Sequence, residues 1–159
     1  MRIVETSVYL GPSLYAHFPV IRFDLDLGPV EAWPTSRLGP PFNDAPFAAL
    51  PGLLEHGCSY GDAGGFRRRV LEDEGTWLGH VLEHVAIELQ NVAGASVTFG
   101  KTRSTGVPGR YHVVFEYEQE EVGLEAGRLA LTLLHSLLPE DLRPERSVPA
   151  DFDFAEERD

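Results

Sequence analysis

Residues 75–90, GTWLGHVLEHVAIELQ, carry an apolar stripe that a helix presents on one face. At about 100° per residue, the stripe consists of Leu78, Val81, Leu82, Val85, Leu89 and Val92. Thr76 can cap this helix and Gly94 can end it, so the sequence predicts a helix from about 76 to 92. A helix with so wide an apolar stripe has to cover another apolar surface, and we expect that surface to be a sheet.

Segments of alternating apolar and polar residues supply the strands of that sheet. We expect strands at 2–10 and 20–28, followed later by a hairpin of strands 96–100 and 111–117. A last helix over about 119–138 repeats apolar residues at helical spacing, namely Val122, Ala126, Leu129 and Leu133. This order of elements predicts a single-domain α+β sandwich, with a mostly antiparallel sheet and helices packed on one face.

The segments between these elements are rich in proline and glycine. Prolines in 28–46 argue against a long helix or a central strand there and predict an ordered loop. A helix over about 45–55 is a weaker prediction, because Pro51 lies inside it. The glycine-rich segment 57–66 lacks the lysine and hydroxyl residue of a phosphate-binding loop. It is either a tight connection or a loop that faces substrate.

Length and composition fit one globular domain at 1–138 followed by an acidic, proline-containing and flexible tail at 139–159. The N-terminus lacks the pattern of a signal peptide, and no run of 18 apolar residues occurs. With the single Cys58, these features predict a cytoplasmic protein. The net charge of −12 repels phosphate backbones and anionic lipids. We therefore expect cationic ligands, and neither nucleic acid nor a membrane as a partner.

A His-x-x-Glu-His pattern, formed by His80, Glu83 and His84, lies on the predicted helix. His80 and His84 are one turn apart, so both rings can reach one zinc ion at about 2.0–2.1 Å. Glu83 can then take a proton from a water molecule without binding the metal itself. The alternative is that these residues form the solvated face of a surface helix. Ile87 falls in the same arc, which argues for the border of a pocket.

A catalytic zinc site usually has a third protein ligand, with water in the fourth position. The acidic segment 116–121 is the expected source, with Glu116 favoured over Glu120. Glu121 and Glu88 are further options. Glu120 and Glu121 also open the last helix, where the helix dipole alone explains a carboxylate. The remaining histidines are expected to pack in the protein or to face solvent; they are His17, His56, His112 and His135.

The chain resembles the N-terminal domain of cyanophycin synthetases over roughly residues 1–138. The matching blocks are LGPSLYAHFPVIRFDLDL, LPGLLEHGCSYGDAGGF, GTWLGHVLEHVAIELQNVAG, FGKTRSTGVPGRYHVVFEY and EEVGLEAGRLAL. In that family the domain precedes an ATP-grasp domain and a Mur-ligase-like domain, which build a poly-aspartate chain with arginine on each side chain. The domain is held to grip the growing polymer. In some members it also resembles metallopeptidases of the pitrilysin-type inverted-zincin class, which would cut the polymer to make primers.

The resemblance implies two functions for the intact pattern at His80, Glu83 and His84. One is a zinc-dependent hydrolase that cleaves cyanophycin or a similar arginine-rich polymer. The other is a non-catalytic module that binds or anchors the polymer beside a ligase domain or subunit. The candidates for contacts with arginine side chains are Asp24, Asp26, Glu55, Asp62 and the cluster 116–121. Without a ligase domain before Asp159, we expect no synthesis by this chain alone; oligomer formation is compatible with the sequence.

Overall fold

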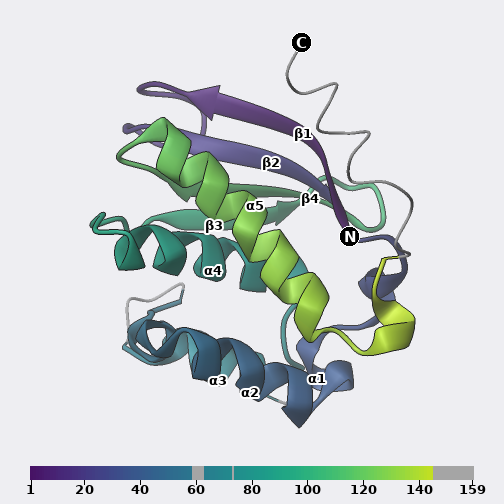
Figure 1. Cartoon of the computed structure of the whole chain (residues 1–159). Helices are drawn as coiled ribbons and strands as arrows, with labels where there is room; N and C mark the ends of the chain where they lie inside the picture. The colour runs from purple at the N-terminus through teal and green to yellow at the C-terminus, as the bar shows by residue number, and fades with distance from the viewer. Residues whose placement is uncertain (59–62, 73, 145–159) are drawn as a thin grey trace, which may run out of the picture.

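The computed structural model describes residues 1–58, 63–72 and 74–144, and its centre is one antiparallel sheet. Four strands pair in the order β1-β2-β4-β3 (Figure 1). They are β1 Arg2–Tyr9, β2 Val20–Asp26, β3 Gly100–Ser104 and β4 Arg110–Glu116. In the central pair, Phe23 of β2 lies opposite Val113 of β4, and both are fully buried. The predicted α+β architecture is confirmed.

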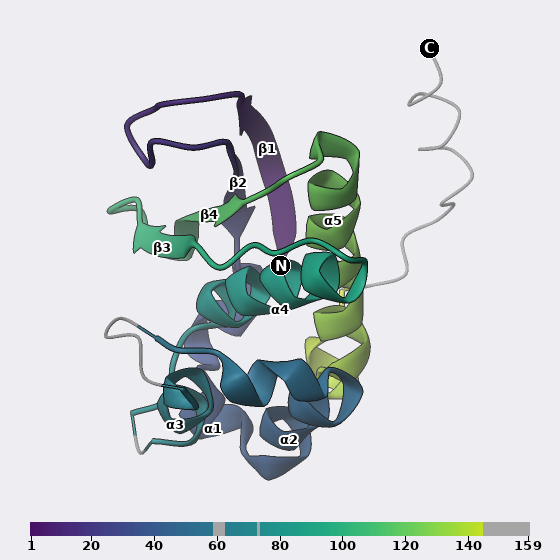
Figure 2. The ribbon, with the colours of Figure 1, turned by 90° about the vertical axis from the view of Figure 1, so that its left-hand side faces the viewer.

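Two long helices, α4 Leu78–Val92 and α5 Glu120–Leu137, cover one face of this sheet (Figure 2). Three short helices lie on the side of α4 away from the sheet (Figures 1 and 2): α1 Thr35–Leu38, α2 Pro40–Ala49 and α3 Gly65–Leu71. Short 3-10 helices occur at Gly28–Ala32, Pro51–Glu55 and Glu140–Leu142, labelled η1, η2 and η3. Within the described residues, no helix has the length and apolarity needed to span a membrane.

The buried face of α4 is wider than its apolar stripe predicts. Leu78, Val81, Leu82 and Val85 are buried as expected, but Val92 is 67% exposed. Glu83 and His84 are also buried, because α4 packs against the sheet on one side and against η2 and α3 on the other. The predicted Thr76 cap is wrong: no side-chain cap bond forms, and the Thr76 hydroxyl contacts His80 instead.

Helix α5 approaches the sheet through small residues. Its buried positions are Gly123, Ala126, Gly127, Ala130 and Leu134. The predicted stripe is therefore correct at Ala126 but wrong at Leu129, which is 48% exposed. A Cβ atom placed on Gly127 would lie 2.5 Å from ring atoms of Phe23 and 2.9 Å from a ring atom of Phe115. A larger residue at 127 would push the helix away from the sheet.

We expect Gly127→Ala to lower the free energy of unfolding by about 1–2 kcal/mol, because overpacking outweighs the gain in helix propensity. The matched control is Gly79→Ala on α4, where the added Cβ would meet its nearest atom, Thr102 Cγ2, at 3.4 Å. That variant should be neutral or slightly stabilising. Urea denaturation of both variants measures the difference; equal effects would contradict a tight α5–sheet contact.

The proline-rich segment is more helical than the sequence predicts. A ten-residue helix, α2, runs from Pro40 to Ala49, and the predicted helix over 45–55 is wrong in its bounds. Two prolines occupy the first turn of α2, where the backbone N–H groups have no helical partner. Pro46 lies inside the helix, and Pro51 begins the separate 3-10 helix η2.

The predicted strand 96–100 is also wrong, since β3 begins only at Gly100. The backbone N–H groups of Thr98 and Phe99 donate to the Glu116 carboxylate at 2.9 and 3.1 Å. These side-chain bonds occupy the two N–H groups, while the Phe99 carbonyl still accepts from the backbone N–H of Glu116 at 2.9 Å. Helix α3 is not predicted from the sequence. Of the predicted tail, Leu142 packs against the core and residues 145–159 lie outside the described residues.

Candidate metal centre

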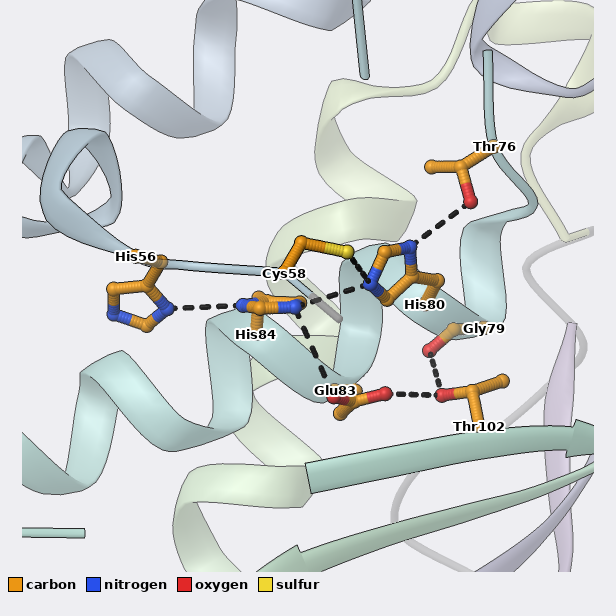
Figure 3. Close-up of polar contacts among 8 residues, drawn as sticks. All are labelled: His56, Cys58, Thr76, Gly79, His80, Glu83, His84 and Thr102. Carbon is orange, nitrogen blue, oxygen red and sulfur yellow. Dashed lines mark hydrogen bonds and ion pairs between the residues drawn. The ribbon is translucent and has the colours of Figure 1, made fainter. Parts of the chain in front are cut away.

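Two histidines of α4 and one cysteine point toward a common centre (Figure 3). His80 Nε2 lies 3.1 Å from His84 Nε2 and 3.5 Å from Cys58 Sγ. All three potential ligand atoms lie within 4.8 Å of one another. The helix contributes His80 and His84 from consecutive turns, as predicted, while Cys58 follows η2 and reaches them from another part of the chain.

The spacing of these atoms fits a tetrahedral zinc ion. Zinc binds histidine nitrogen at about 2.0–2.1 Å and cysteine sulfur at about 2.3 Å, so a tetrahedron places two nitrogens about 3.3 Å apart and nitrogen and sulfur about 3.6 Å apart. The observed separations of 3.1 and 3.5 Å are close to both values. Three protein ligands of the Cys and His type leave one position for water, which is the arrangement of catalytic zinc sites.

Burial keeps both histidines in the form that binds metals. It lowers the pKa of His80 to about 4, with a smaller contribution from the positive charge of Arg69. Burial also lowers the pKa of His84 well below its ordinary value, helped by the neighbouring His80 and His56. Both rings are therefore neutral near pH 7, and each has one nitrogen with an available lone pair.

Glu83 lies beside this centre on the sheet side of α4 (Figure 3). Its Oε2 accepts a 2.6 Å hydrogen bond from the Thr102 hydroxyl, and its Oε1 lies 3.8 Å from His84 Nε2. Gly100 leaves room for it, because a Cβ there would overlap the Glu83 carboxylate. Burial raises the pKa of Glu83 to about 7, against the opposing effect of the Thr102 hydrogen bond. Such a carboxyl can both accept and return a proton near neutral pH.

The raised pKa of Glu83 predicts a pH-dependent stability for the metal-free chain. The folded state holds the Glu83 proton up to about pH 7, whereas the unfolded state loses it near 4.5. Folding stability is therefore lost as the pH rises from 4.5 through 7, by up to about 3 kcal/mol. The lowered pKa values of His80 and His84 act in the opposite direction at acidic pH, so the wild type alone does not isolate the effect.

Glu83→Gln is the comparison that isolates it. The unfolding free energy of this variant minus that of the wild type should increase as the pH rises from 5 to 8. The histidine contributions are the same in both proteins and cancel in this difference. Urea denaturation at both pH values, with a chelator present, measures the change. A difference between the two proteins that stays constant with pH would contradict the raised pKa.

The structure brings Cys58 to the histidines, and not the carboxylates that the sequence suggested. Glu116 lies at the end of β4, and its Oε1 accepts the two backbone hydrogen bonds from Thr98 and Phe99. Glu120 and Glu121 are exposed at the start of α5. Among the described residues, the group of metal-binding side chains that meets at His80 and His84 contains none of these carboxylates.

The centre is also surrounded by polar side chains that were not predicted from the sequence. His56 Nδ1 lies 3.0 Å from His84 Nδ1, and His56 Nε2 lies 2.9 Å from Glu88 Oε1. The Thr76 hydroxyl lies 2.9 Å from His80 Nδ1. The spacing of His56 and Cys58, with one residue between them in a glycine-rich segment, was the available signal. This spacing indicates a metal site only when α4, which carries the two other histidines, is known to lie beside it.

A cavity of about 840 Å³ opens beside these residues. Its lining includes Cys58, His80, Glu83 and His84, together with Trp77 and Arg69. The candidate centre therefore borders space that can hold water and part of a larger ligand. Buried Ile87 agrees with the expectation that this side of α4 is not simply solvated.

The acidic residues suggested for arginine contacts are partly occupied within the protein. Asp24 Oδ1 lies 3.2 Å from both Arg22 Nε and His112 Nε2, and Asp26 lies 3.7 Å from Arg2. Glu55 is exposed at the end of η2. Asp62 lies outside the described residues.

Comparison with known proteins places this chain in a family. Residues 21–139 match the model of the cyanophycin synthase-like N-terminal domain. The chain belongs to this family. It is 45% identical over 140 residues to the cyanophycin synthetase of Geminocystis herdmanii, and 40% identical over 154 residues to that of Crocosphaera subtropica. These alignments cover 87% and 96% of this chain but only 16% and 17% of the relatives. The chain thus spans about a sixth of the cyanophycin synthetases it matches.

Proposed function

We propose that this chain is a zinc-dependent hydrolase that cleaves the backbone of cyanophycin or a related arginine-rich polymer of aspartate. The observation that carries the proposal is the convergence of Cys58, His80 and His84 beside the buried Glu83 and an open cavity. Family membership supports the choice of polymer, since the relatives are cyanophycin synthetases.

Each residue has a defined role in this proposal. Cys58, His80 and His84 would hold the zinc ion, which when bound supplies Lewis-acid activation of water. Glu83 takes a proton from the attacking water and delivers it to the leaving amine, so that water adds across the amide bond and, with the second water proton also on the amine, yields a carboxylate and an ammonium group. Thr102 holds the Glu83 carboxyl in place through its 2.6 Å hydrogen bond.

The experiment that tests the function uses the purified chain, insoluble cyanophycin and zinc. Cleavage should release soluble fragments with new amino termini, detectable by mass spectrometry, and a chelator should stop their release until zinc is restored. Release of arginine alone would indicate attack on the side-chain amide and contradict backbone cleavage. Sedimentation of the chain with the polymer, without any fragment, would instead favour the non-catalytic binding module.

A further inference from the structure

We propose that Glu88 and His56 fix the position of the proton on His84 and so keep His84 Nε2 available to a metal ion. Both would be positioning residues, because neither belongs to the three proposed ligands. The inference rests on the proposed metal centre and adds an asymmetry between its two histidines. The neighbours of His84 hold it in the tautomer that binds a metal. His80 has to move its proton from Nε2 to Nδ1 before it can bind.

The direction of the hydrogen bonds follows from Glu88. A carboxylate oxygen can only accept, so His56 Nε2, at 2.9 Å from Glu88 Oε1, carries the hydrogen. His84 Nε2 faces the candidate centre, so a metal bound there leaves the His84 hydrogen on Nδ1, and His56 Nδ1 has to be the acceptor. It lies 3.0 Å from His84 Nδ1, which has to donate. The His84 proton is therefore on Nδ1, and the lone pair of Nε2 faces His80 and Cys58 (Figure 3).

Packing holds this chain of contacts in place. The side chains of His56 and Glu88 are only 12% and 13% exposed. The His84 ring stacks on Phe66, with centroids 4.0 Å apart and planes 14° apart, so packing limits its rotation. Gly52 leaves space for Glu88, because a Cβ there would overlap the carboxylate. An acidic group that supports a metal-binding histidine through a hydrogen bond is a common feature of metal sites, although here a second histidine lies between them.

Within residues 1–58, 63–72 and 74–144, His80 has no such carboxylate-linked anchor. Its Nδ1 lies 2.9 Å from the Thr76 hydroxyl, which can donate or accept. In the metal-free chain, His80 Nε2 donates to the lone pair of His84 Nε2 across 3.1 Å, and Thr76 donates to His80 Nδ1. With a metal at the centre, the His80 proton has to reside on Nδ1, and the Thr76 hydroxyl reverses and accepts. One histidine thus keeps its tautomer while the other changes.

Long-range proton–nitrogen NMR spectra of the ¹⁵N-labelled chain test this asymmetry, because they identify which ring nitrogen carries hydrogen. His84 should carry it on Nδ1 both without zinc and with zinc. His80 should change from Nε2 to Nδ1 when zinc is added. A metal-free His84 that carries its proton on Nε2 would overturn the inference.

Zinc affinity, measured by competition with a chromophoric chelator, provides the second test. Glu88→Gln should weaken zinc binding by roughly 10–100-fold, because the amide can donate to His56 and so permits the reversed chain of hydrogen bonds. The control, Glu125→Gln at an exposed position of α5, should leave the affinity unchanged. Circular dichroism and thermal unfolding show whether each variant is folded.

A double variant separates positioning from a general effect on structure. His56→Phe keeps an aromatic ring but breaks the connection, so Glu88→Gln should cause no further loss of affinity in that background. Losses that multiply would mean that Glu88 does not act through His56, which would overturn the inference. A wild-type chain that binds no zinc would defeat the proposed function, whereas the metal-free NMR spectrum decides the role of Glu88 and His56 without any metal.

Discussion

Glu83→Gln is expected to reduce cleavage of cyanophycin by roughly 10²–10⁴-fold, the usual contribution of a general base. Glutamine has the size of glutamate and can still accept the hydrogen bond from Thr102, so the fold and the metal ligands should remain. It cannot take a proton from water. Two measurements on the same sample test this: zinc content by mass spectrometry and the release of polymer fragments. Together they separate loss of the metal from loss of the proton acceptor.

The matched control for this prediction is Glu121→Gln, which changes an exposed carboxylate at the start of α5. It should leave cleavage within about twofold of the wild type. A complementary variant, Gly100→Ala, keeps the carboxylate but displaces it, since the new methyl group would occupy its space. It should also slow cleavage. Normal cleavage by Glu83→Gln with zinc retained would remove Glu83 from the chemistry.

The fold was predictable from the sequence where one face of an element is apolar and the other is polar. The alternation in 20–28 and the helical spacing in 76–92 correspond to β2 and α4. The prediction failed where a side chain or a tertiary contact replaces the regular pattern. Glu116 occupies the N–H groups that a strand at 96–100 would have used, and small residues of α5 replace the larger ones expected at its interface.

The candidate site was visible in the sequence only along one helix. His80, Glu83 and His84 are linked by helical spacing, which is a local property. His56, Cys58 and Thr102 come from other elements, and their distance from α4 depends on how η2 and β3 pack against it. No periodicity records that packing. The choice among Glu116, Glu120 and the other acids therefore rested on residue type alone, which does not report position in space.

The identity of the third ligand leads to the sharpest contrast between two variants. Cys58→Ala should lose stoichiometric zinc, because it removes a proposed direct ligand. The fall in zinc affinity should exceed the roughly 10–100-fold that follows removal of a residue that only supports a ligand. Glu116→Gln should keep its zinc affinity. It should instead lose about 1–2 kcal/mol of unfolding free energy, since the bonds from Thr98 and Phe99 would no longer have a charged acceptor.

Both variants need the same two measurements, zinc by competition with a chelator and stability by urea denaturation without metal. Cys58→Ala should change mainly the first and Glu116→Gln mainly the second. Cys58→Ser adds a test of sulfur itself, because a hydroxyl keeps a polar group at the position but is a poorer zinc ligand than a thiolate. The reverse result, with zinc retained by Cys58→Ala and lost by Glu116→Gln, would mean that β4 moves to complete the centre with a carboxylate and that Cys58 only lines the cavity.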